Sequence, residues 1–214
     1  MLSIESLVFN SFQVNTFLVC NEKGDCMVID PAFYSPDEIN YFDRYITSKG
    51  LTIIGQLNTH CHVDHVLGVK HMQTKYKCPL RAHPEELSLL NNAPLMGEVF
   101  GLQVEALSGI DKALGDNEII AIGEDTLLAI LVPGHSPGSI SFYSSEAAFV
   151  VTGDALFQGS IGRTDLPGGD YDTLISSIQN RLLILPPETR VYPGHGDPTT
   201  IGEEASSNPF LSMA

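Results

Sequence analysis

Basic residues are scarce in this sequence of 214 residues, and long apolar runs are missing altogether. Only 11 Lys and Arg stand against 26 Asp and Glu, which gives a formal net charge of −15. Because nucleic-acid binding depends on clustered Lys and Arg, this balance argues against a nucleic-acid partner. No segment approaches the roughly 18 to 20 consecutive apolar residues that a membrane helix needs, so we expect no membrane partner either.

Cysteine is scarce too, and no leader is visible. The four cysteines show no C-x-x-C spacing and are too few to crosslink a chain of this size: Cys20, Cys26, Cys61 and Cys78. The first six residues lack the basic and apolar regions of a secretory signal. We therefore expect reduced cysteines and a cytoplasmic location. The apolar content of 43% is enough for a substantial core, which predicts one compact α/β domain over residues 1–214.

What the sequence does have is a dense group of potential metal ligands, His60, His62, Asp64 and His65. They follow an apolar stretch, residues 51–57, that is typical of a buried strand. In an extended run the side chains at i and i+2 point the same way, so His60 and His62 can bind one ion from one side. Asp64 and His65 then face elsewhere, which predicts two adjacent metal ions rather than one. Cys61 alternates away from the two histidines and is not expected to be a ligand.

Three more candidate ligands stand farther along the chain. His135 and His195 each end a Pro-Gly-His sequence, and Asp154 follows the apolar run 147–151. Imidazole and carboxylate are the ligand types that divalent ions such as zinc accept, so the seven residues together indicate a metal site. We expect the two remaining histidines, His71 and His83, to be ordinary structural residues.

Local patterns predict alternating strands and helices in two similar halves. Strands are expected at residues 4–9, 14–20, 26–30, 118–122, 126–132, 139–143 and 148–151, with a short one near residue 80. A helix should begin after Ser35, with Pro36 in its first turn, and end at Gly50. Further helices are expected at residues 65–76, from residue 84, at 170–184 and after Thr200. Residues 91–115, rich in glycine, are either a loop flanking the site or a plain surface connection.

The order of these motifs resembles the metallo-β-lactamase-fold superfamily, whose H-x-H-x-D-H signature is met by residues 60–65. Residues 162–170 and 193–202 are similar to single-domain bacterial glyoxalase II-like proteins. The resemblance implies an α/β fold with four layers, an αββα sandwich of two mixed sheets flanked by helices. It also implies two divalent ions per chain, with zinc as the default and iron or manganese as alternatives. One ion would sit on His60, His62 and His135 and the other on Asp64, His65 and His195, with Asp154 bridging them.

Two close ions can present hydroxide near neutral pH, and a metal can stabilise the oxyanion that forms when hydroxide attacks an acyl carbon. A thioester suits such a site because a thiolate leaves easily. The sequence therefore favours a glyoxalase II-like hydrolase of a small acyl thioester such as S-lactoylglutathione, with Asp64, Asp154 and a metal-bridging hydroxide as the catalytic groups. The antibiotic-cleaving members of the superfamily lack the bridging carboxylate, which argues against a β-lactamase.

Two other functions stay open at this stage. A mononuclear iron dioxygenase acting on glutathione persulfide would need only His60, His135 and Asp154. A catalytically silent, metal-stabilised binding module is the other.

Recognition of the substrate is the least determined feature. Only 19 residues follow His195, so we expect no separate C-terminal substrate domain of the two-domain glyoxalase II kind, and weak glutathione recognition. Arg163 either meets a substrate carboxylate or pairs with Asp165 to shape its loop. Asp30 is expected to support the site rather than to bind a metal.

Overall fold

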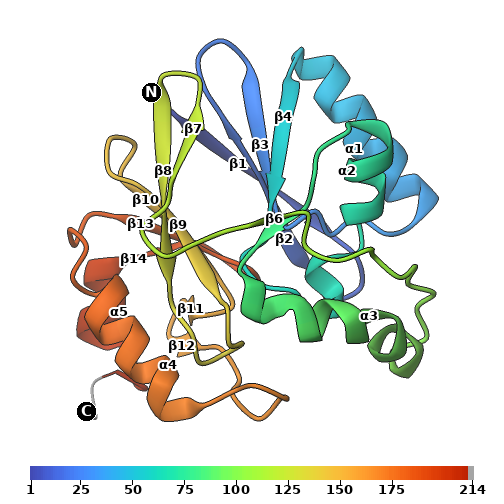
Figure 1. Cartoon of the computed structure of the whole chain (residues 1–214). Helices are drawn as coiled ribbons and strands as arrows, with labels where there is room; N and C mark the ends of the chain where they lie inside the picture. The colour runs from blue at the N-terminus through green and yellow to red at the C-terminus, as the bar shows by residue number, and fades with distance from the viewer. Residues whose placement is uncertain (212–214) are drawn as a thin grey trace.

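The computed structural model describes residues 1–211, which form four layers, with helices on the outside and two β-sheets packed face to face within (Figure 1). The first sheet has the order β1-β2-β3-β4: β1 (Ser3–Phe9), β2 (Val14–Cys20), β3 (Asp25–Ile29) and β4 (Thr52–Leu57). The first three strands run antiparallel, and β4 joins β3 in parallel. This sheet is therefore mixed.

The second sheet is mixed as well, because β10 and β13 pair in parallel and the other neighbours pair antiparallel. Its order is β14-β13-β10-β9-β8-β7: β7 (Ile119–Ile122), β8 (Asp125–Leu131), β9 (Ile140–Ser144), β10 (Phe149–Gly153), β13 (Arg190–Pro193) and β14 (Thr199–Thr200). Two small pairs complete the strands: β5 (Arg81–Ala82) with β6 (Lys112–Ala113), and β11 (Leu156–Phe157) with β12 (Ser160–Ile161). The predicted αββα sandwich is confirmed.

The central strands are buried on both faces. Because successive side chains of a strand point to opposite faces, they pack alternately between the two sheets and under the outer helices. On β2, Phe17 and Val19 face the second sheet, while Leu18 faces the outer helices. On β10, Val151 joins the core between the sheets and Val150 packs toward the helices of the second half. Each fully buried side chain of this size stabilises the fold by about 1.5 to 3 kcal/mol.

Helices cover the outer face of each sheet (Figure 1). On the first sheet lie α1 (Pro36–Lys49) and α2 (Val69–Lys75); on the second lie α4 (Tyr171–Ser177), a π-helical turn (Ile178–Leu182) and α5 (Ile201–Ser207). The ends of α1 are as predicted: Ser35 and Glu38 form a capping box, and Gly50 closes the helix in the left-handed conformation at φ 63°. Amphipathic spacing then turns Phe42 and Ile46 into the core.

Two predicted segments differ from the structure. The helix expected at residues 65–76 is a 3₁₀ turn (Val63–His65) followed by α2, because His65 is held in place by contacts of its side chain and Gly68 packs closely on Phe33. After a second 3₁₀ turn (Pro84–Glu86), α3 (Leu87–Val99) continues through Pro94, so residues 91–99 of the expected loop are helical. None of the helices in residues 1–211 combines the length and the apolar character needed to span a membrane.

Candidate metal centre

The seven predicted ligands meet at one place, where loops from both sheets come together. His60 and His62 follow β4, Asp64 and His65 lie on the 3₁₀ turn, and the other three follow β8, β10 and β13: His135, Asp154 and His195. Their side-chain atoms form two neighbouring groups in which all potential ligand atoms lie within 4.8 Å of one another: His60 with His62 and His135, and Asp64 with His65 and His195.

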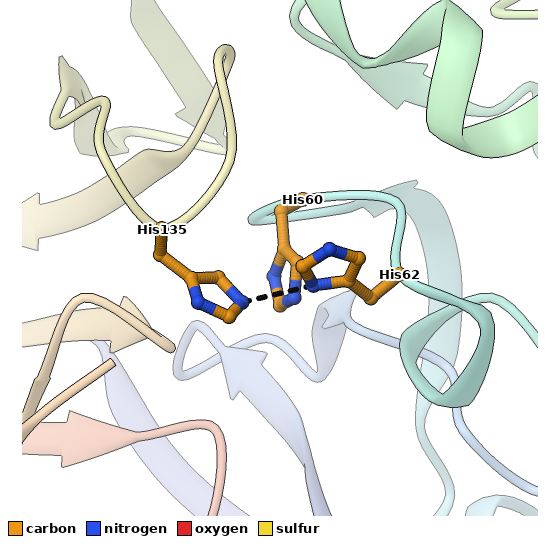
Figure 2. Close-up of side chains that lie close together, drawn as sticks. All are labelled: His60, His62 and His135. Carbon is orange, nitrogen blue, oxygen red and sulfur yellow. Dashed lines mark hydrogen bonds between the residues drawn. The ribbon is translucent and has the colours of Figure 1, made fainter. Parts of the chain in front are cut away.

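The first group consists of three imidazoles that point toward one another (Figure 2). The His62 Nδ1 lies 2.9 Å from the His135 Nε2. The His135 Nδ1 is held by the carbonyl of Arg163 at 2.8 Å, and the His60 Nδ1 by the Thr59 hydroxyl at 3.0 Å. These contacts leave the Nε2 atoms of His60 and His135 turned to the centre of the group. Three nitrogens with room for a fourth ligand are the set that catalytic zinc uses.

Buried atoms without a partner support the fit of the two groups to cations. The His60 Nε2, which faces the first group, and the Oδ1 of Asp154, which faces the second, are buried and lack a hydrogen-bond partner among the described residues. Burying such polar atoms costs free energy unless another group binds them. Cations held by the two groups would bind both atoms.

The second group joins two imidazoles to the carboxylate of Asp64, and the carboxylate of Asp154 lies beside it. The His195 Nε2 lies 3.4 Å from an oxygen of Asp64 and 3.4 Å from an oxygen of Asp154. The His65 Nε2 lies 3.8 Å from Asp64 and 3.5 Å from Asp154. The backbone carbonyl of Phe12 accepts from the His195 Nδ1 at 2.9 Å and so fixes the direction of that ring.

Asp154 stands between the two groups. Its Oδ2 is 3.8 Å from His135 of the first group, and its Oδ1 is 3.5 Å from His65 of the second. One carboxylate therefore faces both sets of ligands, which is the position that a bridging ligand needs.

The two groups differ in charge. Burial, with the neighbouring His135 and His65, lowers the pKa of His62 to about 4, so its imidazole is neutral at pH 7 and free to bind a metal. Burial opposes the charge on His195, but hydrogen bonds to Asp154 and Asp64 outweigh it and raise the pKa of His195 to about 9. A divalent cation in the second group would therefore displace a proton and take over its role of balancing the two carboxylates.

Asp30 supports both groups and is not free to bind a metal. It follows β3 in the left-handed conformation, at φ 50°, which turns its carboxylate inward. That carboxylate accepts from the Thr59 N–H at 2.7 Å, the Thr59 hydroxyl at 2.6 Å and the His65 Nδ1 at 3.0 Å. Asp30 lies close enough to His60 and His65 to count as a possible ligand, but both of its oxygens already accept hydrogen bonds. These contacts suit the expected supporting role, which stays a prediction.

Glu86 is a supporting residue that the sequence did not reveal. Its buried carboxylate accepts from the Cys61 N–H at 2.7 Å and from the Gly138 N–H at 2.7 Å. Burial raises the pKa of Glu86, against the opposing effect of these donors. The carboxylate thereby ties the loop of His60 and His62 to the loop of His135. The sequence showed no local pattern for this role beyond a glutamate near a turn, because the two groups that Glu86 binds are backbone N–H groups 25 and 52 residues away.

A pocket with a cavity volume of about 460 Å³ opens over the metal ligands. Leu89, Ala93 and Met96 of helix α3 line it, together with Phe157 and Leu166 from later in the chain. Arg163 also lines the pocket. Residues 91–99 thus flank the site, which was one of the two roles considered for this part of the chain.

Arg163 forms an ion pair with Asp165, one of the two roles considered for it. Its guanidinium donates twice to Asp165, at 2.7 Å for both bonds, and the two side chains are largely exposed. The remaining histidines lie apart from the ligand groups: His71 contacts Asp43 at 3.0 Å, and His83 caps the 3₁₀ turn before α3. Cys61 is fully buried and belongs to neither group.

Known proteins are similar to this chain in sequence and in fold. Residues 10–195 match the family described as the metallo-beta-lactamase superfamily. The chain is 39% identical to the probable metallo-hydrolase YqgX of Bacillus subtilis, over 94% of this chain and 93% of that protein. It is 35% identical to the hydroxyacylglutathione hydrolase GloC of Haemophilus influenzae, over 99% of both.

Solved structures agree. The BLEG-1 B3 metallo-beta-lactamase superposes with a TM-score of 0.90 at 33% identity, covering 98% of this chain and 100% of that one. The protein TTHA1623 in a di-iron-bound form superposes with a TM-score of 0.87 at 38% identity, covering 97% and 100%.

Proposed function

Because this chain belongs to the metallo-beta-lactamase superfamily, we propose that it is a hydrolase that uses two divalent metal ions to cleave small acyl thioesters. The arrangement of two ligand groups around Asp154 carries the proposal. His60, His62 and His135 would hold one ion, and Asp64, His65 and His195 the other. Asp154 would contact both.

When bound, two close divalent ions lower the pKa of a water between them toward neutrality and polarise a carbonyl oxygen. The protein holds its ligand side chains in fixed directions, because Thr59, Arg163, Asp30 and Phe12 each bind the outward nitrogen of one histidine. The carboxylates of Asp64 and Asp154 supply the negative charge that balances the ions.

The pocket itself favours an easily expelled leaving group. Hydrolysis adds water across the C–S bond of a thioester and releases a carboxylate and a thiol. A thiol has a pKa of about 8.5, so the thiolate departs without a dedicated proton donor. Apart from the predicted metal ligands, the described residues that line the pocket include no carboxylic acid and no histidine that could serve as such a donor. The named activity of the GloC relative, hydroxyacylglutathione hydrolysis, is of this chemical kind.

Metal content and product chemistry test the proposal together. Zinc-loaded and iron-loaded protein are assayed separately. Release of free thiol is measured with S-lactoylglutathione as the substrate, and oxygen uptake is measured with glutathione persulfide. We expect two metal ions per chain and thiol release. One iron per chain, with oxygen uptake and no thiol release under either metal, would establish the dioxygenase instead. The di-iron form of TTHA1623 makes iron a metal to be tested alongside zinc.

Two substitutions check the placement of the site. Asp154→Ala removes the carboxylate between the two groups and should abolish thiol release. His71→Ala removes a histidine whose partner is Asp43, outside the site, and should leave the turnover number unchanged. Loss of activity in His71→Ala, with fold and metal content intact, would show that the site is misassigned.

A second candidate function is hydrolysis of a β-lactam, favoured by the likeness to the BLEG-1 enzyme. Cleavage of an amide bond expels a nitrogen that needs a proton, and the lining residues offer no separate donor. A chromogenic cephalosporin should therefore be hydrolysed far more slowly than a thioester by the same zinc-loaded protein. Faster hydrolysis of the cephalosporin than of the thioester would favour the β-lactamase.

A further inference from the structure

The pocket over the ligand groups has apolar walls. Five of its 16 lining residues are predicted metal ligands, and nine of the other eleven are apolar or cysteine. The apolar side chains come from separate parts of the chain, namely the loop after β1, α3, β11 and the loop after β12: Phe12, Leu89, Ala93, Met96, Phe157 and Leu166. At about 460 Å³ the cavity falls within the roughly 300 to 1,000 Å³ of pockets that enclose most of a small ligand.

An aromatic pair closes one side of this pocket. The rings of Phe12 and Phe100 meet edge to face with their centroids 5.1 Å apart, although the two residues lie in different loops. The Phe12 carbonyl also holds His195, so the same residue orients a ligand histidine and lines the pocket. An apolar group placed here would contact the aromatic pair and lie beside the reacting centre.

The charges of the pocket do not suit a charged substrate arm. A glutathione thioester carries two carboxylates and one ammonium group. Among the described lining residues Arg163 alone is a Lys or Arg, and Asp165 already neutralises its charge and accepts two of its five N–H donors. The chain as a whole carries a formal net charge of −15. A thiol arm with negative charges therefore has little to hold it inside the pocket.

We infer that the pocket binds the acyl arm of the substrate, and that the preferred substrates are thioesters of apolar acids of medium length or with an aromatic ring. The thiol arm stays in solvent and contributes little to recognition. This inference rests on the proposed thioesterase function and adds the substrate class to it. Each methylene that moves from water into the apolar pocket should strengthen binding about threefold to fourfold.

A series of thioesters of one neutral thiol, N-acetylcysteamine, tests the inference on the zinc-loaded protein. The acyl groups are acetyl, butanoyl, hexanoyl and benzoyl, and S-lactoylglutathione is measured beside them. We expect kcat/KM to rise at least tenfold from acetyl to hexanoyl and to exceed the value for S-lactoylglutathione. Equal values across the series, or S-lactoylglutathione as the best substrate, would overturn the inference while leaving the thioesterase in place.

Binding is measured separately, so that failure of the proposed function can be recognised. Ketone analogues in which CH₂ replaces the thioester sulfur are titrated by calorimetry into the zinc-loaded protein. The dissociation constant should fall along the same acyl series whether or not turnover occurs. Absence of hydrolysis with length-dependent binding would refute the thioesterase and keep the apolar pocket. Binding that does not depend on chain length would refute the pocket assignment.

Phe100→Ser tests the contribution of the aromatic pair. Phe100 is 51% exposed, so its replacement should leave the fold intact. We expect a higher KM for the hexanoyl thioester, by about fivefold or more, with kcat little changed, because uniform binding is lost. Phe210→Ser is the matched control, since Phe210 is 41% exposed and does not line the pocket. An equal effect of both variants would contradict the assignment.

Discussion

A single carboxylate, that of Glu86, connects the two loops that carry the three histidines of the first ligand group. Each of its oxygens accepts one backbone N–H, from Cys61 and from Gly138. The amide of a glutamine has only one oxygen, and its NH₂ group would face an N–H donor. Glu86→Gln should therefore lower the free energy of unfolding by about 1 to 3 kcal/mol. It should also weaken metal binding about tenfold, because the loops lose their fixed separation.

The exposed neighbour Glu85 provides the control for Glu86→Gln. Denaturant unfolding of the metal-free proteins and competition with a chelator measure the two effects. If Glu85→Gln and Glu86→Gln behave alike in both measurements, Glu86 has no special role in positioning the loops.

Gly194, just before the ligand His195, shows how close the backbone comes to the site. A Cβ atom added there would collide with the Oδ1 of Asp154 and would lie 2.8 Å from the Cε1 of His65. Gly194→Ala should therefore displace ligands of both groups and lower metal affinity by about tenfold to a hundredfold. Gly115→Ala, where an added Cβ has nothing within 4 Å, should bind metal normally. Isothermal titration calorimetry with zinc compares the two variants. Equal zinc affinities would show that the backbone near Asp154 can move to accommodate the added methyl group.

At the scale of single residues, the sequence was informative about the ligands but, apart from Asp30, did not indicate the residues that support them. The ligands could be named because His60, His62, Asp64 and His65 stand together in a recognisable spacing. The supports act through backbone groups or across long stretches of chain, as Phe12 does through its carbonyl and Glu86 through two N–H groups. Neither kind of contact leaves a local pattern of residue types.

Among the secondary-structure elements, α1 and α2 are joined by a polar network around Asp43. The Asp43 carboxylate on α1 pairs with Lys75 at 2.6 Å and accepts from the Tyr76 hydroxyl at 2.7 Å. His71 lies 3.0 Å away. Burial by itself would raise the pKa of Asp43, but these three partners outweigh it and hold that pKa below its ordinary value.

This network predicts how stability depends on pH. A carboxylate with a lowered pKa in the folded state adds stability above its unfolded pKa of about 3.9, and this stability is lost as the pH falls through the folded value. Asp43→Asn should therefore lower the free energy of unfolding by about 1 to 3 kcal/mol at pH 7. The difference from the unmodified protein should shrink below about pH 4.

Denaturant unfolding of metal-free protein measures the effect of Asp43→Asn, so that loss of bound metal at low pH does not contribute. Asp37→Asn is the control, because Asp37 is an exposed residue of the same helix. A difference between Asp43→Asn and the unmodified protein that stays constant down to pH 2 would show that the carboxylate charge is not the source of the stability.

Elements with strong local signals were predicted well, and the short strand expected near residue 80 is β5, but other two-residue strands were missed. Helix α1 has a capping box, a proline in its first turn and a closing glycine, so both ends could be predicted. Strands β11, β12 and β14 have two residues each, too few to show the alternation that identifies a strand. The helix expected to begin at His65 begins four residues later, because contacts of His65 with Asp30 override local propensity.

At the scale of the whole molecule, the ligand groups are assembled from both halves of the sandwich. The first half supplies His60, His62, Asp64 and His65, while His135, Asp154 and His195 come from loops of the second sheet. The core between the sheets packs the two halves against each other and so places these loops side by side. The sequence order of the motifs indicated this arrangement through family resemblance, whereas the apolar pocket over the site became visible only in three dimensions.

The central claim is that two metal ions act together in thioester hydrolysis, and a stoichiometric titration tests it most directly. Metal-free protein is titrated with zinc while thiol release from one acyl thioester is followed at each addition. Because Asp154 faces both ligand groups, we predict that activity rises until two zinc ions are bound per chain and then stays constant. Full activity at one zinc ion per chain, or no thiol release at two, would contradict the account.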